Sequence, residues 1–185
     1  MTSSSPDKAK LAELVSKLAV VHGKVTLSSG IEADYYVDLR RATLHHEAAV
    51  LVGKVMLDLL VENSLSPDAV GGLTMGADPV ATAMLHQASS RGMSLDAFVV
   101  RKEAKKHGMA RQVEGPDISG RKVVILEDTS TTGGSPLTAA KAAEEAGAEV
   151  LGIATVVDRD TGARAAIESA GYAYYSALSL SDLGL

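Results

Sequence analysis

The chain contains no cysteine and no tryptophan, and it has only one phenylalanine among its 185 residues. Without cysteine it can form no disulfide and offers no thiolate to a metal, which is compatible with a reducing cytoplasm. It also lacks any apolar run of about eighteen residues and any basic N-terminus followed by an apolar stretch. We therefore expect a cytoplasmic protein with no membrane partner and no secretory signal.

Basic residues are in short supply as well, since 18 Lys and Arg stand against 23 Asp and Glu for a net charge of −5. Proteins dedicated to nucleic acids neutralise phosphates with clustered cations, so this balance argues against a nucleic-acid partner. The remaining composition, 46% hydrophobic and 22% charged, is ordinary for a globular protein. No repeat, linker or low-complexity tract divides residues 1–185, which we expect to form a single domain.

The most informative stretch covers residues 121–136. It opens with four apolar residues, 123–126, as in a strand that is buried on both faces of a parallel sheet. Two adjacent carboxylates follow, Glu127 and Asp128, and then a run of small polar residues. A helix is predicted to begin at Ser135, which would cap it, with proline next in its first turn.

Each part of this stretch has a chemical use. The start of a helix offers backbone N–H groups and a positive dipole to a phosphate, and glycines let the backbone come close to it. Carboxylates at the carboxyl end of a strand can accept hydrogen bonds from sugar hydroxyls. Together these features indicate a site for a ribose 5-phosphate, and the alternative is an ordinary turn with solvated acids. The small loop residues are Thr129, Ser130, Thr131, Thr132, Gly133, Gly134 and Ser135.

The rest of the chain alternates short apolar strands with helices, which is typical of an α/β fold with a parallel sheet. About the first 40 residues are predicted to form a hood outside this alternation, with a helix beginning at Ser5-Pro6 and a hairpin over residues 24–39. The other predicted helices cover about 44–61, 79–91, 135–147 and 161–170. The predicted strands are 69–74, 97–100, 123–126, 150–157 and 172–178.

Residues 101–120 differ from their surroundings because they are rich in charge and have no apolar periodicity. A stretch of this kind between two core strands is typical of a mobile loop. It begins at the edge of the sheet where Asp128 is expected, and it carries Arg101, Lys102, Lys105 and His107. These side chains could hold a pyrophosphate, and the alternative is a solvated charged loop.

Residues 123–135 resemble the phosphoribosyl-pyrophosphate motif of type I phosphoribosyltransferases, with Ser130 where that family usually has an aliphatic residue. The segment R-K-E-A-K-K-H-G, residues 101–108, resembles the catalytic loop of orotate phosphoribosyltransferases. Similarity to that family extends over residues 25–36, the glycine-rich 71–79 and the pair Asp158-Arg159. The resemblance implies a type I phosphoribosyltransferase fold, a central parallel sheet flanked by helices, with an N-terminal hood and a flexible catalytic loop.

The resemblance also implies the reaction and its participants. The 5-phosphoribosyl group would pass from phosphoribosyl pyrophosphate to N1 of orotate, giving orotidine 5′-phosphate and pyrophosphate in pyrimidine biosynthesis. Mg²⁺ is the implied cofactor, carried by the diphosphate without a dedicated protein ligand and reached by Asp128 through water. The implied assembly is a homodimer in which the catalytic loop reaches the neighbouring subunit's site.

Site residues follow from the same resemblance. Catalysis would involve Lys105, His107 and Asp128. Phosphoribosyl pyrophosphate would be bound by Arg101, Lys102, Lys105, His107, Glu127, Asp128, Thr129, Ser130, Thr131, Thr132, Gly133, Gly134 and Ser135. Orotate would be bound by Ser28, Tyr35, Tyr36, Thr132 and Arg159. Ser28 and Gly76 stand where family members carry lysines, so a contact at Gly76 would fall to backbone amides.

Other interpretations of these residues stay open. Tyr35 and Tyr36 could be ordinary cross-strand aromatics, and Asp158-Arg159 a structural ion pair at a strand end. A purine phosphoribosyltransferase could share the central motif, although Arg159 and residues 101–108 argue against it. A regulator that senses phosphoribosyl pyrophosphate while binding nucleic acid would need a clustered basic face, which the sequence lacks outside residues 101–108.

Overall fold

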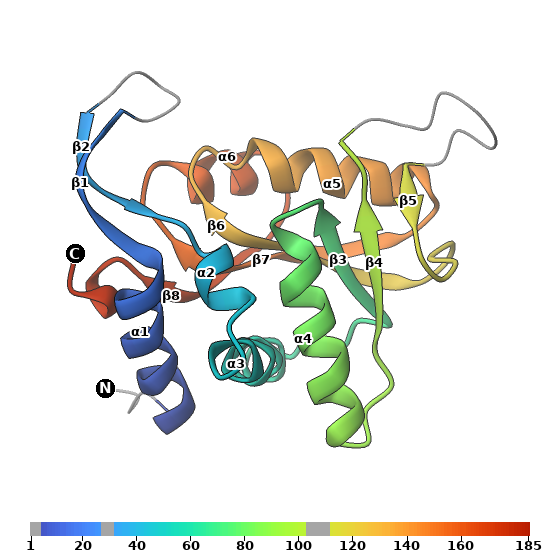
Figure 1. The fold of residues 1–185 in the computed structure, drawn as a ribbon. Coiled ribbons are helices and arrows are strands. Elements are labelled where there is room, and N and C mark those ends of the chain that lie inside the picture. Colours follow the sequence, from blue (N-terminus) through green and yellow to red (C-terminus); the bar gives the residue numbers. More distant parts are fainter. Residues whose placement is uncertain (1–4, 27–31, 103–111) are drawn as a thin grey trace.

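A six-stranded sheet forms the centre of the structure, a computed structural model that describes residues 5–26, 32–102 and 112–185 (Figure 1). The strands lie in the order β5-β4-β3-β6-β7-β8, and every neighbouring pair is parallel except β4 and β5. Their bounds are β3 Ala69–Leu73, β4 Asp96–Val100, β5 Val113–Glu114, β6 Lys122–Ser130, β7 Glu149–Asp158 and β8 Tyr174–Ser179. The predicted parallel α/β sheet is therefore present, with the motif strand β6 near its middle.

Helices cover both faces of this sheet (Figure 1). One buried cluster joins α1, α3 and α4 to Val124 and Leu126 of β6, and a second joins α5 and α6 to Val123 and Ile125. The unbroken apolar run of β6 is thus explained, because successive side chains of a strand point to opposite faces and both faces are covered. None of the helices in the described residues is long and apolar enough to cross a membrane. The helices are α1 Pro6–Ala19, α2 Arg40–Thr43, α3 Ala48–Glu62, α4 Ala77–Ser90, α5 Gly134–Glu145, α6 Ala163–Ser169 and the 3₁₀ turn η1 Ser181–Leu183.

The N-terminal region contains the predicted helix and hairpin. The Oγ atom of Ser5 accepts a hydrogen bond of 3.2 Å from the N–H of Lys8, and Pro6 occupies the first helical position, so α1 begins as expected. Strand β1 (Val20–Thr26) pairs with β2 (Glu32–Val37) in an antiparallel hairpin that is separate from the main sheet. The helix predicted over about 44–61 differs, because α2 precedes it and α3 begins only at Ala48.

Two boundaries in the central motif differ from the prediction. Strand β6 does not end at Leu126 but continues to Ser130, because β7 pairs with it as far as Asp158. Helix α5 is not capped by Ser135. It follows Gly133, which has a φ of 81°, and no side chain makes a cap hydrogen bond there. A left-handed conformation favours glycine, so this position explains one of the two adjacent glycines.

The predicted loop over residues 101–120 contains the short edge strand β5. The N–H of Arg101 donates to the carbonyl of Gln112 at 2.9 Å, and Nε2 of Gln112 donates to the carbonyl of Arg101 at 3.0 Å. Ile118, which follows β5, is buried. Lys105 and His107 lie outside the described residues, as does Ser28.

Strand β3 approaches its two neighbours closely at adjacent glycines. A Cβ atom on Gly71 would lie 2.1 Å from the carbonyl oxygen of Phe98, and one on Gly72 would lie 2.2 Å from that of Leu126. Such contacts are far inside van der Waals distance and involve backbone atoms that cannot rotate away. Glycine at both positions therefore allows β3 to sit between β4 and β6.

Replacing Gly72 with alanine should reduce the free energy of unfolding by about 2–4 kcal/mol, because the added methyl group forces β3 and β6 apart. Gly134→Ala is the matched control, since its Cβ would meet only Oγ1 of Thr132 at 3.8 Å. Denaturant unfolding of both variants measures the difference. A comparable loss in the two variants would contradict the steric explanation.

Candidate active site

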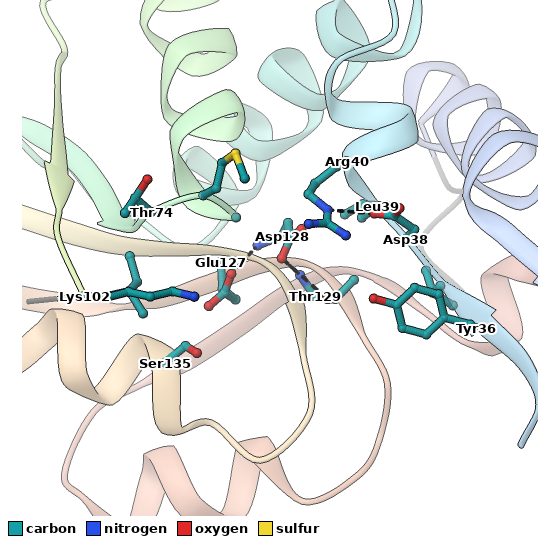
Figure 2. Close-up of a pocket in the computed structure, with 14 residues that line it drawn as sticks. Tyr36, Asp38, Leu39, Arg40, Thr74, Lys102, Glu127, Asp128, Thr129 and Ser135 are labelled. Carbon is teal, nitrogen blue, oxygen red and sulfur yellow. Dashed lines mark hydrogen bonds and ion pairs between the residues drawn. The ribbon is translucent and has the colours of Figure 1, made fainter. Parts of the chain in front are cut away.

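A pocket of about 310 Å³ opens where the carboxyl end of β6 meets the loop after β3 and the end of β2 (Figure 2). The carboxyl ends of parallel strands are the usual ligand sites of α/β sheets. Charged and hydroxyl side chains dominate the lining. The residues are Tyr36, Val37, Asp38, Leu39, Arg40, Leu73, Thr74, Met75, Gly76, Lys102, Glu127, Asp128, Thr129 and Ser135.

Two adjacent carboxyl groups stand at the end of β6 in this pocket. Glu127 is only 7% exposed, and its Oε1 accepts a 3.1 Å hydrogen bond from the N–H of Asp128. Oδ1 of Asp128 accepts a 2.6 Å bond from the N–H of Thr129. Burial raises the pKa of Glu127 to about 8, and the negative charge of Asp128 adds to the shift. At neutral pH Glu127 therefore holds a proton and can donate a hydrogen bond.

The loop between β3 and α4 lies directly against these carboxyl groups. A Cβ atom on Gly76 would be 2.4 Å from Oε1 of Glu127 and 2.9 Å from Oδ1 of Asp128. At this position, which carries lysine in some family members, a side chain would require the carboxyl groups of Glu127 and Asp128 to move, and glycine presents backbone to the pocket. In the first turn of α4, Oδ2 of Asp78 is buried without a hydrogen-bond partner among the described residues.

Cations reach the pocket from two sides. Lys102, two residues after β4, lines the pocket and points toward Glu127 (Figure 2). Arg101 does not line the pocket, and its Nη1 lies 3.7 Å from Oε1 of Glu114 in the edge strand. On the opposite side stands Arg40, whose Nε donates to Oδ1 of Asp38 at 2.8 Å.

Arg40 and Asp38 are pocket residues that the sequence analysis did not select. Asp38 comes directly after β2 and Arg40 begins α2, just as Glu127 and Asp128 follow the apolar part of β6. Polar residues at the end of a strand were therefore the available signal. It could not be used without knowing that the hairpin delivers the end of β2 to the same pocket as β6.

The small-residue loop after β6 divides into parts with different surroundings. Thr129 and Ser135 line the pocket, and Gly133 is buried against Ile167 of α6. Ser130 is 1% exposed, and its hydroxyl group bonds inside the protein with Asp158 and Tyr174. Its side chain is therefore not directed to a ligand. The remaining predicted residues of the loop are exposed beside the pocket: Thr131, Thr132 and Gly134.

The predicted pair Tyr35 and Tyr36 is separated by the alternation of β2. Tyr36 lines the pocket, and its ring centre lies 6.0 Å from Cζ of Arg159. Tyr35 instead packs against the buried cluster beneath the hairpin. Arg159 lies next to the pocket residue Tyr36 without being part of the lining.

The donor set of the pocket suits a hard cation held through water. In the described part of the chain, no three His, Asp or Glu side chains are grouped so that they could ligate a metal. Asp128 nevertheless presents a carboxylate in the pocket, and carboxylate and water oxygens are the ligands that Mg²⁺ prefers. A magnesium ion carried by a phosphorylated substrate therefore fits these residues.

Comparison with known proteins places the chain in a family. Residues 42–170 match the phosphoribosyl transferase domain. The orotate phosphoribosyltransferase of Streptomyces avermitilis is 65% identical over 179 residues, which cover 96% of this chain and 97% of that protein. The chain belongs to the orotate phosphoribosyltransferase family. The family resemblance carried by residues 101–108 and 123–135 is thereby confirmed.

Solved structures of orotate phosphoribosyltransferases share the fold. The enzyme of Mycobacterium tuberculosis in complex with Fe(III) dicitrate has a TM-score of 0.88 and 60% identity, covering 97% of this chain and 100% of that chain. The same enzyme in complex with 5-phospho-α-D-ribosyl 1-diphosphate has a TM-score of 0.84 and 54% identity, with coverage of 97% and 100%. The predicted type I phosphoribosyltransferase fold, a mostly parallel sheet flanked by helices, is confirmed by these matches.

The raised pKa of Glu127 predicts a dependence of stability on pH. Because its pKa is about 8 in the folded protein and near 4.5 when unfolded, the folded state binds the proton more tightly between those values. Stability should therefore fall as pH rises from about 5 to about 9, and Glu127→Gln should remove this part of the fall. We expect the variant to gain a few degrees in Tm over the parent at about pH 9 but not at about pH 5.

Thermal unfolding of the ligand-free protein at both pH values checks this expectation. Glu62→Gln, which changes an exposed glutamate at the end of α3, is the control and should behave as the parent does at both. A Glu127→Gln protein with the same Tm difference from the parent at both pH values would mean that the carboxyl group is ionised throughout.

Proposed function

We propose that the chain transfers the 5-phosphoribosyl group of phosphoribosyl pyrophosphate to N1 of orotate, releasing pyrophosphate and forming orotidine 5′-phosphate. The observation that carries the proposal is the pairing of Glu127 and Asp128 at the end of β6, in one pocket with Lys102 and the start of α5. Acids for a ribose and a helix start for its phosphate are what such a substrate requires. A family member whose structure contains the same diphosphate covers this chain almost completely.

In this proposal the phosphoribosyl group sits over the β6–α5 turn. The backbone N–H groups and hydroxyls of residues 131–135 bind the 5-phosphate at the positive end of α5. Asp128 accepts hydrogen bonds from the ribose hydroxyls. Glu127, which is protonated at neutral pH, can donate one of its own or act through water.

The leaving pyrophosphate needs positive charge, and the pocket supplies it from Lys102 and Arg40, with backbone amides from residues 74–76 between them. By resemblance to the family, we propose that Arg101, Lys105 and His107 also contact the diphosphate. When bound, Mg²⁺ would neutralise part of the charge that develops on the leaving group, held through water by Asp128.

The reaction requires no covalent bond between the protein and the substrate. N1 of orotate attacks the anomeric carbon while the bond to pyrophosphate breaks, through a transition state with oxocarbenium character. The protein contributes alignment of the two reactants and a preorganised field around the departing charge. Exclusion of water also matters, since water would hydrolyse the activated sugar.

We assign the orotate end of the pocket to Arg159, Tyr36 and Thr132. A guanidinium group can bind the carboxylate of orotate through two parallel hydrogen bonds. Tyr36, whose ring centre lies 6.0 Å from Cζ of Arg159, lines the pocket together with the carboxyl groups of β6. The hairpin of β1 and β2 would serve as the hood over this end. Ser28 would belong to the same hood.

Arg159→Ala should weaken orotate binding by about 2–4 kcal/mol, because it removes a bidentate charged contact and leaves the carboxylate unpaired. The KM for phosphoribosyl pyrophosphate should change much less. Steady-state kinetics with each substrate varied in turn measures both. Arg91→Ala, which breaks an exposed ion pair with Asp58, is the control. A higher KM for the diphosphate with an unchanged KM for orotate would refute the assignment.

We further propose a homodimer in which residues around Lys105 complete the neighbouring subunit's site. Lys105→Ala and Asp128→Asn should each abolish most activity, but mixed subunits should recover part of it, because a heterodimer then contains one intact site. Activity after mixing, together with mass spectrometry of the dimers, tests this. Heterodimers that form and remain inactive would show that each site is built from one chain.

A further inference from the structure

A chain of hydrogen-bonded polar groups adjoins Arg159 and takes no part in lining the pocket. Oγ of Ser130 donates to Oδ1 of Asp158 at 3.1 Å, and Oη of Tyr174 lies 2.5 Å from the same Oγ. Ser130 and Tyr174 are 1% and 5% exposed, and neither lines the pocket. Buried hydroxyl groups of this kind are costly unless they are satisfied, so their arrangement is specific.

The direction of these hydrogen bonds is determined by counting protons. The hydroxyl of Ser130 has one hydrogen, which it donates to Asp158, so Tyr174 must donate to Ser130. Burial raises the pKa of Tyr174, which keeps its hydroxyl group protonated. The ring of Tyr174 is fixed by Arg164, whose Cζ lies 4.8 Å from the ring centre. The order is therefore Tyr174 to Ser130 to Asp158.

Asp158 connects these hydrogen bonds to the backbone around Arg159. Its Oδ1 also accepts a 2.9 Å hydrogen bond from the N–H of Asp160, which has a left-handed φ of 52°. The N–H of Arg159 donates to the carbonyl of Ser130 at 3.3 Å. Asp158 and the amide of Arg159 are thus both bound to Ser130 at the end of β6, and the amide of Asp160 is bound to the side chain of Asp158.

We propose that Ser130 and Tyr174 are positioning residues for Arg159 and so determine how well the site binds the carboxylate of orotate. The inference rests on the proposed function, since it assumes that Arg159 contacts orotate. It also explains the serine in the motif, where the family resemblance led us to expect an aliphatic side chain. A polar link to Tyr174 replaces apolar packing at this position.

The test measures binding by calorimetry, which requires no turnover. Tyr174→Phe removes the hydrogen bond to Ser130, and Ser130→Ala removes both hydrogen bonds of the chain. Neither residue lines the pocket. We expect the Kd for orotidine 5′-phosphate to rise roughly 3- to 10-fold in each, as for the loss of one or two buried hydrogen bonds, with the Kd for phosphoribosyl pyrophosphate changed less than about twofold. Tyr172→Phe is the matched control. Tyr172 lies two residues before Tyr174, and the substitution removes an exposed hydrogen bond of 2.8 Å from its hydroxyl group to Glu144.

A second arm makes the same substitutions in an Arg159→Ala background, where they should cause no further loss. Further loss there, or equal weakening of both ligands with a lower Tm, would overturn the inference by showing a merely structural role. If Arg159→Ala binds orotidine 5′-phosphate as the parent does, the proposed role of Arg159 fails. If Arg159→Ala weakens binding while Tyr174→Phe and Ser130→Ala do not, only the positioning inference fails.

Discussion

The pocket depends on one constraint, the burial of a carboxyl group at the end of the central strand. Glu127 is buried, and the loop after β3 lies against its carboxyl group, where Gly76 allows a close approach because it has no side chain. Gly72 also contributes to this close packing, because it lets β3 lie against the backbone of β6. Desolvation then makes the two neighbouring acids unlike, since Glu127 keeps its proton while Asp128 stands beside it in a more solvated position. A donor and an acceptor thus arise from two adjacent residues of the same chemical type.

Around this pair the charges come from separate elements. Lys102 follows β4, Arg40 begins α2 after β2, and the positive dipole belongs to α5. In the proposed function, the three phosphate groups of the substrate meet these positive groups. Because the groups sit on different parts of the fold, the field is in place before the reaction begins. This arrangement suits a reaction in which the leaving group carries most of the charge.

Much of the fold and of the candidate site could be predicted from the sequence, because the patterns that indicate them lie within a few adjacent residues. The apolar run of β6, the Ser5-Pro6 helix start and the glycine-rich turn each follow from a few adjacent residues. The errors concern contacts between distant residues. Strand β6 extends to Ser130 because β7 pairs with it, and β5 exists because β4 offers an edge. The side-chain partner of Ser130, Tyr174, lies 44 residues away, and nothing adjacent to either residue indicates the contact.

The edge strand β5 has a consequence for the evolution of the enzyme. Arg101 and Gln112 are joined by two hydrogen bonds, so both ends of the intervening segment are fastened at one point of the sheet. The entropy of closing a loop rises only with the logarithm of its length, by about 0.6 kcal/mol for each doubling. Insertions or deletions between these two residues would therefore leave the scaffold nearly unchanged. The length of the segment between Arg101 and Gln112 can therefore change without a large change in the stability of the sheet.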